Sequence, residues 1–91
     1  MKIEFDELTI SEAEAFYKLL TENIDNLENN ELTLDFNDVE KIDLSCVQVL
    51  FSLKKFCTNT NINLSFTNLQ SKQLQKTIKT YNLEKLLGLT Q

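Results

Sequence analysis

The end of a strand and the start of a helix are predicted in the stretch Lys41-Ile42-Asp43-Leu44-Ser45-Cys46-Val47-Gln48-Val49-Leu50. The apolar Ile42 closes the strand, Asp43 marks the turn, and the apolar spacing that follows predicts a helix beginning at or near Ser45. Ser45 can cap this helix, because serine is a preferred capping residue. Its hydroxyl also lies beside helical N–H groups that favour negative charge, so the same position suits a phosphate. Local chemistry leaves both interpretations open.

Three segments with alternating apolar residues predict strands on either side of this junction, at residues 2–5, 32–36 and 62–66. Helices are expected between and after them. The first begins at a capping box, Ser11 with Glu14, and ends near residues 28–30, and the third is capped by Ser71. This alternating order predicts an α/β fold in which residues 1–91 form a single domain with a mixed, mainly parallel β-sheet and helices packed against it.

Each predicted helix carries an apolar face at helical spacing. The faces comprise Ala13, Phe16, Tyr17, Leu20, Ile24 and Leu27 in the first helix, Cys46, Val49, Leu50, Leu53, Phe56 and Cys57 in the second, and Leu74, Ile78 and Tyr81 in the third. Leu83, Leu86, Leu87 and Leu89 are expected to anchor the C-terminal end. With no proline and one glycine in the chain, asparagine is expected to form the turns at residues 29–30, 59–61 and 68.

Charge and composition exclude several classes of function. The formal charge is −5, with 14 acidic and 9 basic residues, which argues against binding to nucleic acid or to an anionic membrane surface. The apolar runs are too short to span a bilayer, so no direct membrane insertion is expected. Lys2 is followed closely by Glu4, Asp6 and Glu7, which does not fit a signal peptide, so a cytoplasmic location is expected.

The chain offers little for catalysis. It has no histidine and no glycine-rich loop, so we expect no enzyme activity, no cofactor and no metal site. Cys46 and Cys57 fall on one predicted helix, roughly 16 Å apart along its axis. They are too far apart for a disulfide within that helix and are expected to be reduced core residues.

Polar residues gather where the predicted strands end. Asp35, Asp38, Asp43 and Ser45 are expected at the C-terminal edge of the sheet, where open α/β sheets place ligand and partner sites. A second candidate surface is the less apolar side of the second helix, with Gln48, Ser52 and Lys55. Val47 and Phe51 lie beside it and are either part of this surface or part of the core.

Residues 31–89 resemble the STAS domain family (sulfate transporter and anti-sigma factor antagonist). The family has an apolar strand ending in Asp, a turn, an apolar residue and then Asp-Ser-Ser-Gly at the start of a helix. Here the strand is Leu32–Phe36, the apolar residue is Ile42, and the motif is Asp43-Leu44-Ser45-Cys46. Glu7-Leu8-Thr9-Ile10 is also similar to the family's segment before its first helix. Leu44 replaces the first serine of the motif and Cys46 replaces its glycine, while the second serine is kept.

The resemblance implies a non-enzymatic signalling module of the kind found in small stand-alone bacterial STAS proteins. Ser45 matches the position that is phosphorylated in the anti-sigma factor antagonists. Partners of such modules are serine kinases of the anti-sigma factor type or chemotaxis kinases. The alternative is an accessory STAS subunit of an ABC lipid-transport system, in which Ser45 is only structural. The candidate partner-binding residues are Asp35, Asp38, Asp43, Leu44, Ser45, Gln48 and Ser52.

Cys46 bears on the choice between these alternatives, because its side chain narrows access to the backbone where the family has glycine. A phosphate on Ser45 would add about −1.5 to −2 charges to the acidic edge. We therefore expect it to repel an acidic partner surface without changing the fold.

Overall fold

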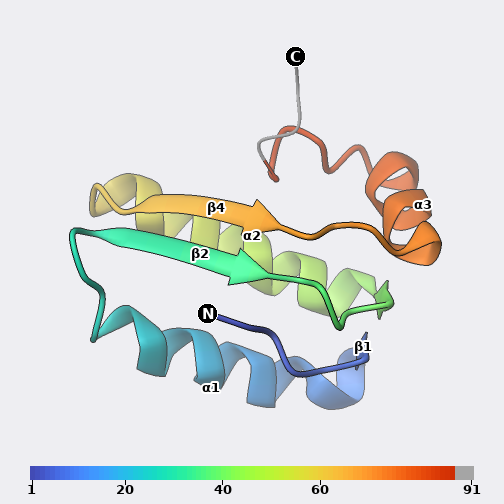
Figure 1. Cartoon of the computed structure of the whole chain (residues 1–91), viewed down its shortest axis with the longest axis horizontal. Helices are drawn as coiled ribbons and strands as arrows, with labels where there is room; N and C mark the ends of the chain where they lie inside the picture. Colours follow the sequence, from blue (N-terminus) through green and yellow to red (C-terminus); the bar gives the residue numbers. More distant parts are fainter. Residues whose placement is uncertain (88–91) are drawn as a thin grey trace.

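The computed structural model describes residues 1–87 of the 91-residue chain. Strands and helices alternate along it, as the sequence predicts (Figure 1). The elements are β1 (Glu7–Leu8), the 3-10 helix η1 (Ile10–Glu12), α1 (Ala13–Ile24), β2 (Glu31–Asp35), β3 (Lys41–Ile42), α2 (Leu44–Asn59), β4 (Asn63–Thr67) and α3 (Lys72–Thr80). The predicted α/β class is confirmed.

All strand pairings among residues 1–87 are parallel. β2 pairs with β4 from Glu31 opposite Asn63 to Asp35 opposite Thr67, and β1 pairs with β3. The strands therefore form two short parallel sheets, one of β1 and β3 and one of β2 and β4. The strand predicted at residues 2–5 is reduced to one bridge between Lys2 and Asp35. The N–H of Ile3 donates to the carbonyl of Asp35 (3.0 Å), so β2 lies between this segment and β4.

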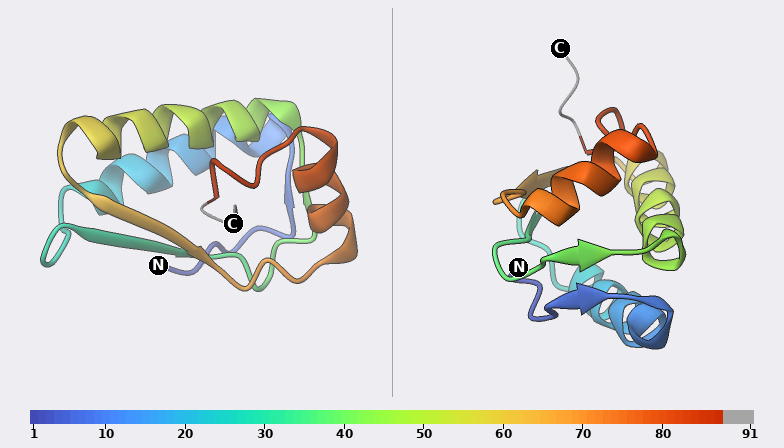
Figure 2. Two further views of the ribbon diagram at one scale, coloured as in Figure 1. Left: turned by 90° about the horizontal axis from the view of Figure 1, so that it is seen from above. Right: turned by 90° about the vertical axis from the view of Figure 1, so that its right-hand side faces the viewer.

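The β2–β4 sheet has one covered and one open face. Figure 2 shows α1 and α2 on the same side of the two strands, with α3 across the end where the strands terminate. Successive side chains of a strand point to opposite faces. Leu32 and Leu34 are therefore buried beneath the helices, while Thr33 and Ser65 are exposed on the open face, with their hydroxyl oxygens 3.0 Å apart.

The core comprises most of the predicted apolar faces. Phe16 and Leu20 of α1, Leu50 and Leu53 of α2, and Leu74 and Ile78 of α3 are buried, together with Leu83, Leu86 and Leu87. Leu89 lies outside the described residues. Three predicted core residues are instead exposed: Tyr17 (56%), Phe56 (44%) and Tyr81 (49%). The sequence left open whether Val47 and Phe51 of α2 belong to the core or to the second candidate surface. Val47 is buried and Phe51 is exposed.

Asparagine supplies the turns, as predicted. Asn29, Asn30, Asn61 and Asn68 all have φ between 55° and 59°, a left-handed conformation that asparagine tolerates better than most residues. Ser71 accepts a hydrogen bond from the N–H of Leu74 (3.3 Å) and caps α3, which confirms its predicted role.

The predicted start and end of the first helix are wrong. α1 begins at Ala13 after the 3-10 helix η1 and ends at Ile24, before the predicted residues 28–30. The residue at the N-cap of α1 is Glu12, and its side chain makes no capping hydrogen bond. The hydroxyl of Thr9 donates to the carboxylate of Glu12 (2.8 Å), which is a contact between two side chains and not a capping box.

Candidate functional site

Asp43 fixes the start of α2. It has an extended backbone at the N-cap position, and its Oδ1 accepts the N–H of Cys46 (3.3 Å). Its Oδ2 accepts the N–H of Ile10 (2.8 Å), so one carboxylate ties the start of α2 to the segment before α1. The expectation that Ser45 caps the helix is wrong, because the helix begins at Leu44 and Asp43 occupies the cap. Ser45 is the second helical residue and is half-buried.

Two apolar side chains lie exposed at this helix start. Ile10 is 73% exposed and Leu44 is 48% exposed, and the Asp43–Ile10 hydrogen bond holds their segments together. We call the surface formed by Ile10, Asp43, Leu44, Ser45 and Gln48 the α2 N-terminal surface. Sequence reasoning missed Ile10 because nothing local shows that it sits beside a helix 33 residues further along the chain. An exposed apolar patch rimmed by polar residues can mark a protein interaction site, which makes this surface a candidate.

Cys46 lies beneath this surface, with its side chain in the core. Its thiol is buried and donates to the carbonyl of Thr9 (3.4 Å). Burial first, and then the nearby carboxylates of Asp43 and Glu12, raise the pKa of the Cys46 thiol to about 11. The thiol therefore stays protonated at neutral pH and acts as a packing residue rather than a nucleophile. Glu12, which sequence reasoning also missed, adds a second carboxylate near the helix start.

Asp35 and Asp38 belong to a different network. Oδ1 of Asp35 accepts the side-chain amide of Asn68 (2.8 Å) and the backbone N–H of Asn37 (2.9 Å). These two hydrogen bonds, the first being the larger cause, lower the pKa of Asp35 below its ordinary value. Asp38 forms an ion pair with Lys2 (3.2 Å). The residues of the predicted acidic edge thus have two separate roles. Asp35 and Asp38 belong to a hydrogen-bond and ion-pair network at the turn after β2, and Asp43 caps α2.

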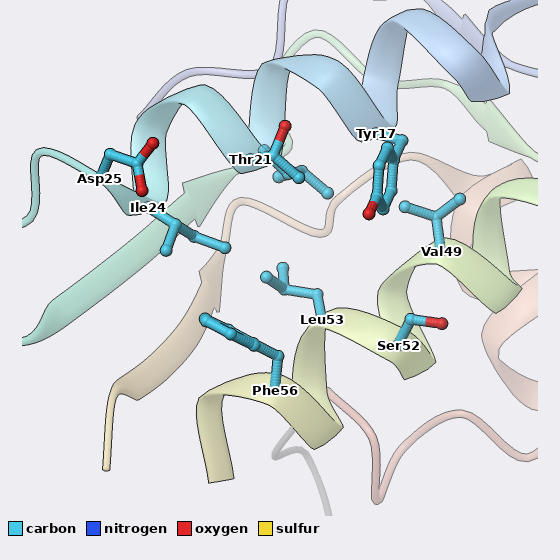
Figure 3. A pocket seen from close by; sticks show the side chains of 9 residues that line it. Tyr17, Thr21, Ile24, Asp25, Val49, Ser52, Leu53 and Phe56 are labelled. Atoms are coloured by element: carbon cyan, nitrogen blue, oxygen red, sulfur yellow. The ribbon is translucent and has the colours of Figure 1, made fainter. Parts of the chain in front are cut away.

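A groove runs between α1 and α2 on the helical side of the molecule (Figure 3). Its volume is about 340 Å³. Its lining residues are Tyr17, Leu20, Thr21, Ile24 and Asp25 from α1 and Val49, Ser52, Leu53 and Phe56 from α2. Tyr17 and Phe56, two of the exposed residues predicted to be buried, therefore border one groove, and this set includes the predicted partner-binding residue Ser52.

The groove and the α2 N-terminal surface are continuous along one helix. Residues four apart share a face of an α-helix. Leu44, Gln48 and Ser52 follow this spacing and all three are exposed. Four of the predicted site residues (Leu44, Ser45, Gln48 and Ser52) therefore lie along α2, and Asp43 precedes them.

The carboxylate at the start of α2 is engaged in backbone hydrogen bonds. Both oxygens of Asp43 accept backbone N–H groups, which makes this carboxylate a structural tie. Within residues 1–87, no group of three histidine, cysteine or acidic side chains is arranged to hold a metal ion. In the same part of the chain, every helix is too short or too polar to cross a lipid bilayer.

Comparison with known proteins identifies the family. A family model described as "Mlab, STAS domain" matches residues 6–89. No curated protein matches the chain. The match covers nearly the whole sequence and agrees with the parallel α/β fold, so the chain belongs to the STAS domain family. STAS domains are generally non-enzymatic modules for regulation or protein interaction, and this chain is a STAS-type module.

Proposed function

We propose that residues 1–91 act as one STAS-type signalling domain in the cytoplasm, which binds a regulatory protein through the α2 N-terminal surface. The observation that carries this proposal is the exposure of two aliphatic residues, Ile10 and Leu44, whose segments are joined by Asp43 at the helix start that carries Ser45. A monomeric soluble domain gains nothing in stability from such exposure, whereas a partner would bury both side chains.

Phosphorylation of Ser45 is the proposed switch. A phosphate would bring about −1.5 to −2 charges to a surface that already holds the carboxylates of Asp43 and Glu12. Because Asp43 already caps α2, the added phosphate is not needed for the helix to form. Its main effect would be to repel an acidic partner surface. The proposed partner is a serine kinase of the anti-sigma factor type or a chemotaxis kinase.

The second candidate is an accessory subunit of an ABC lipid-transport system. The buried side chain of Cys46 favours it, because this thiol bonds to Thr9 at the position where the family motif has glycine. Packed in this way, the thiol makes the start of α2 a structural junction with the segment before α1. In that case Ser45 packs at the start of α2 and is not modified.

Site-specific photo-crosslinking separates these candidates. A benzophenone amino acid at Leu44 of the full chain, irradiated in the native cell, should give an adduct that mass spectrometry identifies. The matched control carries the same probe at Thr33, which is exposed on the open face of the sheet. We expect an adduct with a kinase from Leu44 and none from Thr33. An adduct with a transporter ATPase favours the second candidate, and equal labelling from both positions contradicts a site at α2.

A further inference from the structure

β4 is an open edge of its sheet within residues 1–87. The N–H of Asn63 donates to the carbonyl of Asn30 (2.8 Å), and the carbonyl of Thr67 accepts the N–H of Phe36 (2.9 Å). In a parallel pair, alternate residues of a strand bond to the same neighbour. Leu64 and Phe66 therefore direct their N–H and C=O groups away from β2, where the described chain places no strand. In Figure 1, β4 lies on the side of β2 away from α1, and the segment after α3 folds back toward the C-terminal end of β4.

The other edge of this sheet, formed by β2, is covered by the N-terminal segment. Along β2, the nitrogen of Met1 donates to the carbonyl of Thr33 (2.8 Å), and the N–H of Asp35 donates to the carbonyl of Met1 (2.8 Å). The N-terminal segment thus covers the outer edge of β2 with backbone hydrogen bonds. Open edges pair readily with other chains unless they are covered or blocked.

The sequence around β4 lacks the features that block pairing. Edge strands are commonly protected by charged side chains or proline. Residues 56–71 contain neither, although 25% of the chain is charged and its formal charge is −5. Two copies of this acidic chain would oppose like charges over much of their surfaces. Along β4, two copies can approach each other without bringing like charges together. Leu64 and Phe66 are also only half-buried, so they leave apolar surface to cover.

We propose that the edge of β4 binds β4 of a second copy, forming a two-fold symmetric dimer with strand order β2-β4-β4′-β2′. In such a dimer the strands run antiparallel, and Leu64 exchanges hydrogen bonds with Phe66 of the second copy. Ser65 then lies opposite Ser65 of that copy in a non-hydrogen-bonded pair, with Cα atoms about 4.5 Å apart. This self-association goes beyond the proposed function and involves none of the residues of the α2 N-terminal surface.

Disulfide trapping tests the register directly. The Cα separation of the Ser65 pair falls within the range that a disulfide accepts, so Ser65→Cys should give a covalent dimer under mild oxidation. Thr33→Cys is the matched control, because Thr33 lies on the same open face beside Ser65 but one strand further in. Cys46 and Cys57 are buried and should not react in the folded protein. Dimer from Ser65→Cys alone supports the proposal, and equal dimer or none from the two variants overturns it.

Sedimentation equilibrium of the unmodified chain gives the second readout. We expect a reversible dimer that Ser65→Lys weakens about tenfold or more, because the two new cations would lie directly opposite each other. Thr33→Lys should leave the dimer unchanged. Both side chains are exposed, so neither variant should unfold the protein. A monomer at all concentrations up to about 500 µM, or equal weakening by both variants, overturns the proposed edge.

Discussion

Both sides of α2 carry apolar residues, but in opposite environments. On one side, Cys46, Val47, Leu50, Leu53 and Cys57 are at most 5% exposed and pack into the core. On the other side, Leu44, Phe51 and Phe56 are at least 44% exposed, although each is as apolar as the buried residues. α2 therefore stabilises the fold with one face, and we propose that the other face binds a partner.

The largest contrast is expected between Leu50→Ala and Gln48→Ala. Leu50 is buried, so its truncation should lower the free energy of unfolding by about 2–5 kcal/mol through lost burial and an unfilled cavity. Gln48 is exposed two residues away, and its truncation should change stability by less than about 0.5 kcal/mol. Urea denaturation of both variants measures the difference. Similar losses for the two would contradict the assignment of the two faces.

Cys46→Gly tests the buried side of α2 at the residue that follows Ser45. Glycine should cost about 1 kcal/mol in helix propensity, and the loss of the buried thiol adds to this. If a partner or kinase needs close approach to the backbone, the same variant should be phosphorylated faster at Ser45 despite its lower stability. Urea melts and a phosphorylation assay with the captured kinase separate the two effects. A variant as stable as the wild type would show that Cys46 does not pack in the core.

Asp43→Ala should have a smaller effect on stability, of about 1–2 kcal/mol. It removes the cap of α2 and leaves the N–H of Ile10 without its acceptor. Asp38→Ala is the matched control, because the exposed ion pair with Lys2 should contribute less than about 1 kcal/mol. Thermal melts give the stabilities, and amide hydrogen exchange at Ile10 reports the lost tie. Unchanged exchange at Ile10 would show that Asp43 does not hold the two segments together.

Asp35 should give the smallest effect, visible as a pH dependence. Its pKa is lowered in the folded state, so its contribution to stability is present above the ordinary pKa near 3.8 and is lost as the pH falls through the folded value. Asn68→Gly removes the amide donor while keeping the left-handed backbone. NMR titration of the Asp35 carboxyl should show a higher pKa in this variant. An unchanged pKa would mean that Asn68 is not the main cause.

The sequence predicted the elements better than it predicted their surroundings. The alternation at β2 and β4 and the helical spacing of α2 are local patterns, and the structure places these elements where the patterns indicate. Periodicity shows which residues share a face, but it does not show how far a neighbouring helix covers that face. Tyr17 and Phe56 were predicted to be buried for this reason, and the groove between α1 and α2 leaves both exposed.

Only part of the candidate site could be predicted from the sequence, because the rest depends on tertiary contacts. Asp43 and Ser45 are both good capping residues, and local chemistry does not choose between them. The hydrogen bond from Ile10 favours Asp43, and that contact joins segments far apart in the sequence. The family motif correctly drew attention to residues 43–46. The resemblance also marked residues 7–10, but it did not show that Ile10 and Glu12 lie beside the start of α2, because that placement depends on the tertiary fold.

The central claim is that Ser45 controls partner binding on the exposed side of α2. Isothermal titration calorimetry of the partner captured through Leu44 against wild type, Ser45→Ala and Ser45→Asp tests it most directly. The aspartate should weaken binding about tenfold by like-charge repulsion, which corresponds to about 1.4 kcal/mol. The melting temperature should stay within about 3 °C of wild type, and Ser45→Ala should bind as wild type does. Equal affinities for wild type and Ser45→Asp would contradict the claim and leave Ser45 as a structural residue at the start of α2.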